Sequence, residues 1–178
     1  MVLSIAAVKD WELCQLDVVM AYLEASVKEE LYIELSEDYR DFCDQVGRLQ
    51  NAMRGLVHAG LLWSKTFSAE LAARDFEQCQ VAPCVFRRVL RGNVIVIIVV
   101  YLDNLLVASK TKRDEEQAID DLRSCFPIND LGEAGFYLGC HTTRDRDSGT
   151  LKLDQHRYVW TVALKFTVEK TSTTPAAA

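Results

Sequence analysis

The stretch that decides the fold is VIVIIVVYLDNLLVASK, residues 94–110, in which an apolar run stops at Asp103 and Asn104 and then resumes. The run is much shorter than the roughly 20 apolar residues that a membrane-spanning helix needs. Its residues are mostly β-branched, which favours strands over helices. The stretch therefore predicts a hairpin of two buried strands, with a tight turn at Asp103 and Asn104.

Composition fits one soluble domain of ordinary size. The chain has 178 residues, of which 49% are hydrophobic and 26% are charged, so it can build a core. Its net charge of −6 argues against an autonomous nucleic-acid binder, although a local basic groove or a basic neighbouring domain stays open. The short apolar N-terminus lacks the basic residues of a signal peptide. We therefore expect no membrane partner and an intracellular, cytoplasmic setting.

The chain contains six cysteines, none of them in a C-x-x-C pair. Without a sign of secretion, these are expected to be reduced and mostly buried. A zinc site could be drawn from Cys79, Cys84, Cys140 and His141. Their spacing matches no common zinc finger, so zinc is the weaker interpretation.

Periodicity predicts the other elements. Trp63, Phe67 and Leu71 recur at four-residue spacing, which indicates an amphipathic helix over residues 60–75. Thr111 and Asp114 resemble a capping box at the start of a helix over residues 111–126. The remaining segments predict a short helix over 2–8, strands over 12–19, 30–35, 83–90, 133–142 and 150–155, and a last helix over 156–166. Residues 171–178 are expected to be a flexible tail.

The central order is strand, helix, hairpin, helix and strand, which is the split β-α-β order of ferredoxin-like folds. We therefore expect an α+β fold, with an antiparallel sheet and helices packed on one face. In such a sheet the first strand lies beside the hairpin. Asp17, near the end of that strand, is then expected to lie close to Asp103.

Two carboxylates held close together repel each other unless a cation lies between them. Magnesium prefers hard oxygen ligands and is often held by one or two carboxylates plus substrate phosphates. Two such ions, roughly 3.5–4 Å apart, are the arrangement used by polymerases and nucleases. The alternative is ordinary turn chemistry, because Asp and Asn are common at hairpin tips without any metal. On the pattern alone, ordinary turn chemistry is the favoured interpretation and a metal site is the alternative.

Five motifs in a fixed order resemble the reverse transcriptase of copia-type long-terminal-repeat retrotransposons. The resemblance extends from about residue 11 to residue 158. The motifs are LDVVMAYLEA at 16–25, GLVHAGLLW at 55–63, YLDN at 101–104, DLGEAGFYLG at 130–139 and LDQHRYV at 153–159.

This resemblance implies an RNA-directed DNA polymerase palm with partial fingers over residues 1–170. It implies two-metal nucleotidyl transfer with Mg²⁺ or Mn²⁺, a primer-template of RNA or DNA, a deoxynucleoside triphosphate and a virus-like particle as the setting. Asp17 and Asp103 match the metal-binding aspartates, and Asn104 takes the second position of the catalytic turn. Tyr22 matches the aromatic under the nucleotide sugar, although core packing is its simpler interpretation.

Other positions match less closely. His58 stands where the family has a glutamine near the incoming nucleotide, and a solvated loop histidine is an equally good interpretation. Gly132 and Glu133 match a later palm motif, for which a structural turn is expected.

Several residues depart from the family pattern. Asn104 replaces the second aspartate of the turn, and Arg54 replaces a tyrosine. Within residues 55–63, Val57, His58 and Gly60 replace a lysine, a glutamine and a proline, and Glu24 with Ala25 replaces an asparagine-glycine pair. The basic finger strands, the thumb and the RNase H domain are also expected to be missing.

Two functions stay open on these grounds. The first is a polymerase palm that is impaired, or that works within a larger assembly, with weak metal, nucleotide and primer-template binding. The second is a non-catalytic remnant with a structural or protein-interaction role, and apolar faces that favour self-association. A generic ferredoxin-like interaction domain would explain none of the ordered motifs.

Overall fold

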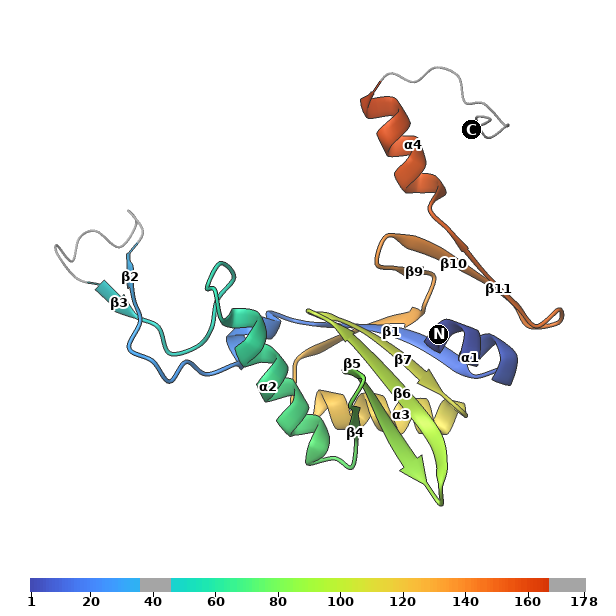
Figure 1. The fold of residues 1–178 in the computed structure, drawn as a ribbon, viewed down its shortest axis with the longest axis horizontal. Helices are drawn as coiled ribbons and strands as arrows, with labels where there is room; N and C mark the ends of the chain where they lie inside the picture. Colours follow the sequence, from blue (N-terminus) through green and yellow to red (C-terminus); the bar gives the residue numbers. More distant parts are fainter. Residues whose placement is uncertain (36–45, 167–178) are drawn as a thin grey trace.

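The protein is an α+β structure built on an antiparallel sheet (Figure 1). The computed structural model describes residues 1–35 and 46–166, so the predicted tail at 171–178 lies outside the described residues. Within the described part, no helix is both long and apolar enough to span a membrane.

The main sheet has six strands in the order β4-β5-β6-β7-β1-β8. Every neighbouring pair is antiparallel. The predicted first strand therefore lies beside the predicted hairpin, which β6 and β7 form. The strands are β1 (Glu12–Val18), β4 (Glu77–Cys79), β5 (Ala82–Leu90), β6 (Asn93–Tyr101), β7 (Asn104–Ser109) and β8 (Ile128–Glu133).

One face of this sheet is covered by α2 (Ala59–Ala72) and α3 (Lys112–Arg123). The predicted helical stripe is confirmed, since Trp63, Phe67 and Leu71 are all buried. Trp63 and Phe67 pack against each other and against Phe126, with ring centroids 5.1–5.4 Å apart. The predicted cap of α3 is also confirmed, because the Thr111 hydroxyl accepts a hydrogen bond from the backbone N–H of Asp114.

The expectation that the helices pack on one face holds only for α2 and α3. Helix α1 (Val2–Lys9) packs on the opposite face, in a second buried cluster with Leu13 of β1 and Leu106 of β7. The physical reason is the two-residue period of strands. Because β1 and β7 are apolar on both faces, the second face also needs a cover.

The predicted strand over 133–142 is wrong as a single strand. It is divided into β9 (Phe136–Tyr137) and β10 (Cys140–Asp145), which form a three-stranded sheet with β11 (Thr150–Asp154). Leu138 and Gly139 have left-handed φ values of 49° and 82°, and two such residues in sequence make a hairpin turn. The last helix, α4 (His156–Lys165), follows and buries none of its residues.

A short two-stranded ladder lies apart from the main sheet (Figure 1). It consists of β2 (Tyr32–Glu34) and β3 (Val46–Arg48). The 3₁₀ helix η1 (Ala21–Glu24) lies between β1 and this ladder in the sequence. Of the described residues between β1 and α2, none belongs to the main sheet.

The predicted hairpin exists, but its turn falls one residue earlier than expected. Tyr101 pairs with Asn104, so the turn residues are Leu102 and Asp103, and Asn104 is the first residue of β7. Leu102 has a φ of 57°, a left-handed conformation that is strained for leucine. Backbone strain of this kind is concentrated at functional sites.

Gly132 and Glu133 lie within β8 and do not form the expected turn. Their pairing with β1 shifts register between Cys14 and Leu16, because β8 contains one extra residue there. Gly132 has a φ of 76°, and its N–H donates to Asp130 at 3.0 Å. The motif is therefore structural, but as a β-bulge with a left-handed glycine.

Candidate active site at the tip of the β6–β7 hairpin

The end of β1 and the hairpin tip bring three of the predicted site residues together. Asp17 is the cross-strand partner of Asn104, and the N–H of Val18 donates to the carbonyl of Asp103 at 2.8 Å. Because Val18 and Asp103 are hydrogen-bonded, Asp17 and Asn104 form a non-hydrogen-bonded pair, whose Cβ atoms approach to about 4.5–5.5 Å.

Strand alternation decides on which face this pair lies. Leu16, Val18 and Leu105 belong to the core beneath α2 and α3. Asp17 and Asn104 alternate with those residues, so their side chains lie on the other face of the sheet. Asp17, Asp103 and Asn104 are each partly exposed. The apolar strands thus support a polar tip that solvent can reach.

Trp63 of α2 stabilises the position of this tip through a hydrogen bond to the backbone of the turn. Its indole N–H donates to the carbonyl of Leu102 at 2.8 Å, while its ring is buried between Phe67 and Phe126. The spacing in the sequence predicted only the packing of Trp63. The hydrogen bond could not be found in this way, because its acceptor depends on the position of the turn.

Both oxygens of the Asp103 carboxylate face donor groups. The side-chain amide of Asn104 donates to Oδ1 at 2.9 Å, and the guanidinium of Arg54 lies 4.0 Å from Oδ2. An aspartate at position 104 would repel Asp103 instead of donating to it. From the sequence, Arg54 is recognised only as a departure from the family pattern. Its contact with Asp103 could not be predicted, because it depends on the path of the chain before α2.

Tyr22 and His58 lie near α2. Tyr22, on η1, is partly buried against the core beneath α2, which fits the packing interpretation. His58 directly precedes α2, is exposed, and lines a cavity of about 480 Å³ with Lys28 and Lys65. In the part of the chain that the structure describes, neither residue bonds to the carboxylates at the tip. Their contacts with a nucleotide stay predictions.

Cys14 lies on β1, three residues before Asp17. Its side chain belongs to the buried core beneath α2 and α3, on the face of the sheet opposite to Asp17. Burial, supported by the nearby charge of Glu115, raises the pKa of the Cys14 thiol to about 12. Glu115 is itself buried and forms an ion pair with Lys112. The thiol is therefore neutral at physiological pH and unsuited to nucleophilic chemistry.

The residues of the suggested zinc site lie in separate places. Cys79 and Cys84 are on β4 and β5 of the main sheet, whereas Cys140 and His141 are on β10 of the smaller sheet. Over residues 1–35 and 46–166, no three or more His, Cys, Asp or Glu side chains form a group able to hold a metal ion.

Comparison with known proteins identifies the family. All of residues 1–178 match the family described as reverse transcriptase (RNA-dependent DNA polymerase), and the chain belongs to that family. It is 31% identical over 99% of its length to the Retrovirus-related Pol polyprotein from transposon TNT 1-94 of Nicotiana tabacum. It is 31% identical over 74% of its length to the Transposon Ty1-BL Gag-Pol polyprotein of Saccharomyces cerevisiae.

A third relative is the Retrovirus-related Pol polyprotein from transposon RE1 of Arabidopsis thaliana, which is 27% identical over 89% of the chain. These matches make the chain a reverse-transcriptase-like domain of the copia type. It spans 14%, 7% and 11% of the length of the three relatives, in the order given.

Reverse transcriptases generally use divalent metal ions, and the tip can be tested for its fit to them. It offers two carboxylates, Asp17 and Asp103, and the neutral Asn104. Asp103 already faces a donor at each oxygen, whereas a two-ion site needs oxygens that are free and negatively charged. As folded, these residues do not fit a two-ion site.

Proposed function

We propose that this chain is the palm of a copia-type RNA-directed DNA polymerase whose nucleotidyl transfer is impaired. The observation that carries this proposal is the meeting of Asp17 with Asn104, directly beside Asp103, at the tip of an apolar hairpin. The strand order β6-β7-β1-β8, with α2 and α3 on one face, supports a ferredoxin-like palm because it follows the split β-α-β order.

The proposed partners are a primer-template and a deoxynucleoside triphosphate, within the cytoplasmic particle of such an element. Tyr22 is proposed to contact the sugar and His58 the incoming nucleotide. The net charge of −6 opposes binding to phosphates. The isolated chain is therefore expected to hold nucleic acid weakly.

A non-catalytic remnant is the second candidate, and two observations favour it. The hydrogen bond from Asn104 to Asp103 satisfies the tip without an ion. In addition, α4 exposes Val159, Trp160 and Leu164, and exposed apolar patches mark sites of protein interaction. Self-association through this helix would fit a structural role.

Primer extension on an RNA template with Mg²⁺ and deoxynucleotides separates the two candidates. The palm proposal predicts slow incorporation that is lost in Asp17→Asn and kept in Asp120→Asn, which removes the same charge from the exposed face of α3. A folded parent that neither extends nor binds the primer-template would support the remnant.

A further inference from the structure

Arg54 is the cation that lies at the candidate site. It precedes α2, and its guanidinium is 4.0 Å from Oδ2 of Asp103. Its side chain is 87% exposed, whereas that of Asp103 is 36% exposed. Among the ion pairs of the described residues, this one alone involves a carboxylate of the tip.

The rest of the tip is held in place, so Arg54 is its movable part. The backbone of Asp103 is bonded to Val18 of β1, and the preceding carbonyl of Leu102 is bonded to Trp63. Asn104 donates to Oδ1 of Asp103 from within β7. An exposed arginine, by contrast, changes rotamer freely, and its pairing is readily exchanged.

We propose that Arg54 is a built-in counter-cation that competes with divalent ions for Asp103. With a guanidinium 4.0 Å from Oδ2 and an amide donor at Oδ1, the charge of the carboxylate is partly offset by the chain itself. A divalent ion must displace Arg54 or bind against its positive charge. This inference rests on the proposed function, because it assigns the same carboxylates to metal binding. It makes Arg54 a positioning residue that sets the metal affinity of the tip.

The test measures Mn²⁺ binding from the electron paramagnetic resonance signal of the free ion. Arg54→Gln removes the charge, Arg54→Lys keeps it, and Arg113→Gln is the matched control. Arg113 is exposed on α3, which follows the far end of β7. The expected result is binding about 3- to 10-fold tighter in Arg54→Gln, with the other two variants close to the parent. High salt should reduce the difference, because the pair is exposed.

Equal Mn²⁺ affinities of Arg54→Gln and Arg113→Gln would overturn the inference, since only net charge would then matter. If Asp17→Asn abolishes binding while Arg54→Gln leaves it unchanged, the inference fails but the proposed metal role of the tip stands. If neither Arg54→Gln nor Asn104→Asp binds Mn²⁺, both fail. Arg54 is exposed, so its variants should melt like the parent, and this is checked before binding is compared.

Discussion

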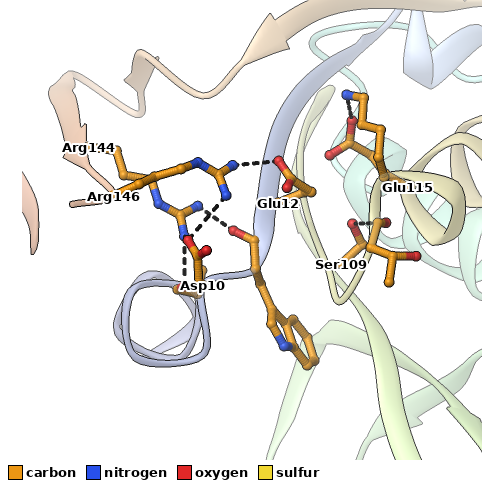
Figure 2. A network of polar contacts seen from close by, with 10 residues as sticks. Asp10, Glu12, Ser109, Glu115, Arg144 and Arg146 are labelled. Carbon is orange, nitrogen blue, oxygen red and sulfur yellow. Dashed lines mark hydrogen bonds and ion pairs between the residues drawn. The ribbon is translucent and has the colours of Figure 1, made fainter. Parts of the chain in front are cut away.

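Strand β1 has a cluster of acids and arginines at each end, and the two clusters differ in how fully their charges are satisfied. At the start of β1, Arg144 donates to the carbonyls of Trp11 and Ala6 and to the carboxylate of Asp10. Arg146 joins Asp10 to Glu12, at 3.1 and 2.5 Å (Figure 2). Arg144 and Arg146, with Asp10 and Glu12, are called the arginine clamp below. Arg144 is only 7% exposed.

At the other end of β1 the same residue types are arranged loosely. In the described part of the chain, Asp17 makes no ion pair, and Arg54 approaches Asp103 only to 4.0 Å while remaining mostly exposed. A buried arginine that also binds backbone carbonyls holds elements together. An exposed arginine beside partly exposed carboxylates is held neither by burial nor by bonds to backbone carbonyls, so a ligand can displace it. The comparison therefore separates a structural cluster from a candidate functional one.

The largest expected effect comes from removing the support under the tip. Trp63→Ala should lower the free energy of unfolding by about 3–5 kcal/mol, because it leaves a large cavity beside Phe67 and Phe126. Trp63→Phe should cost about 1 kcal/mol for the lost bond to Leu102. Urea unfolding measures both. A Trp63→Ala protein as stable as the parent would show that α2 does not support the hairpin.

The clamp and the tip should respond differently to loss of an arginine. Arg144→Gln should destabilise by about 2–3 kcal/mol, because it removes the buried guanidinium that donates to the carbonyls of Trp11 and Ala6. Arg54→Gln should stay within about 0.5 kcal/mol, as for most exposed substitutions. Urea unfolding of the two variants tests the contrast, and equal losses would contradict it.

The buried thiol of Cys14, which lies on β1 between the two clusters, is expected to make the protein less stable at high pH. Its pKa is raised from 9.0 to about 12 by burial, so the folded state keeps the proton while the unfolded state loses it. The contribution of Cys14 to the free energy of unfolding is therefore complete below pH 9 and is lost as the pH rises from 9 toward 12. At pH 10.5 the loss should be about 2 kcal/mol.

The control for this prediction is Cys14→Ala, compared with the parent by urea unfolding at pH 8 and at pH 10.5. The variant carries a constant offset from the smaller side chain, but it should lose less stability over this range. Parallel curves for the two proteins would remove Cys14 as the cause.

A smaller effect is expected at Asn104. In metal-free buffer, Asn104→Asp should lower stability by about 0.5–1.5 kcal/mol, because a donor to Asp103 becomes a like charge. Added Mn²⁺ should raise the melting temperature of this variant by more than it raises that of the parent. Thermal melts with and without Mn²⁺ measure it. A variant that is insensitive to Mn²⁺ would mean that the charge at position 104 has no part in metal binding.

Much of the fold could be predicted because local patterns agreed with it. The β-branched run predicted β6, the spacing of Trp63, Phe67 and Leu71 predicted α2, and the order of elements placed β1 beside the hairpin. The proximity of Asp17 to Asp103 followed from that order.

The parts that could not be predicted depend on long-range or strained geometry. The turn falls at Leu102 and Asp103 because leucine adopts a left-handed φ, for which the sequence gives no signal. Arg144 meets Asp10 across 134 residues, and Arg54 meets Asp103 only after the chain has crossed the ladder of β2 and β3. The spacing of apolar residues along the sequence carries no information about such long-range contacts.

The proposed function makes the hairpin tip a depleted metal site and not merely a turn. Calorimetric titration with Mn²⁺ on the parent, Asn104→Asp and Asp17→Asn tests it most directly. Weak binding is expected for the parent, and no binding for Asp17→Asn. Tighter binding is expected for Asn104→Asp, because a carboxylate attracts a divalent ion far more than an amide does. Identical isotherms for the three proteins would contradict it and leave Asp103 as a turn residue.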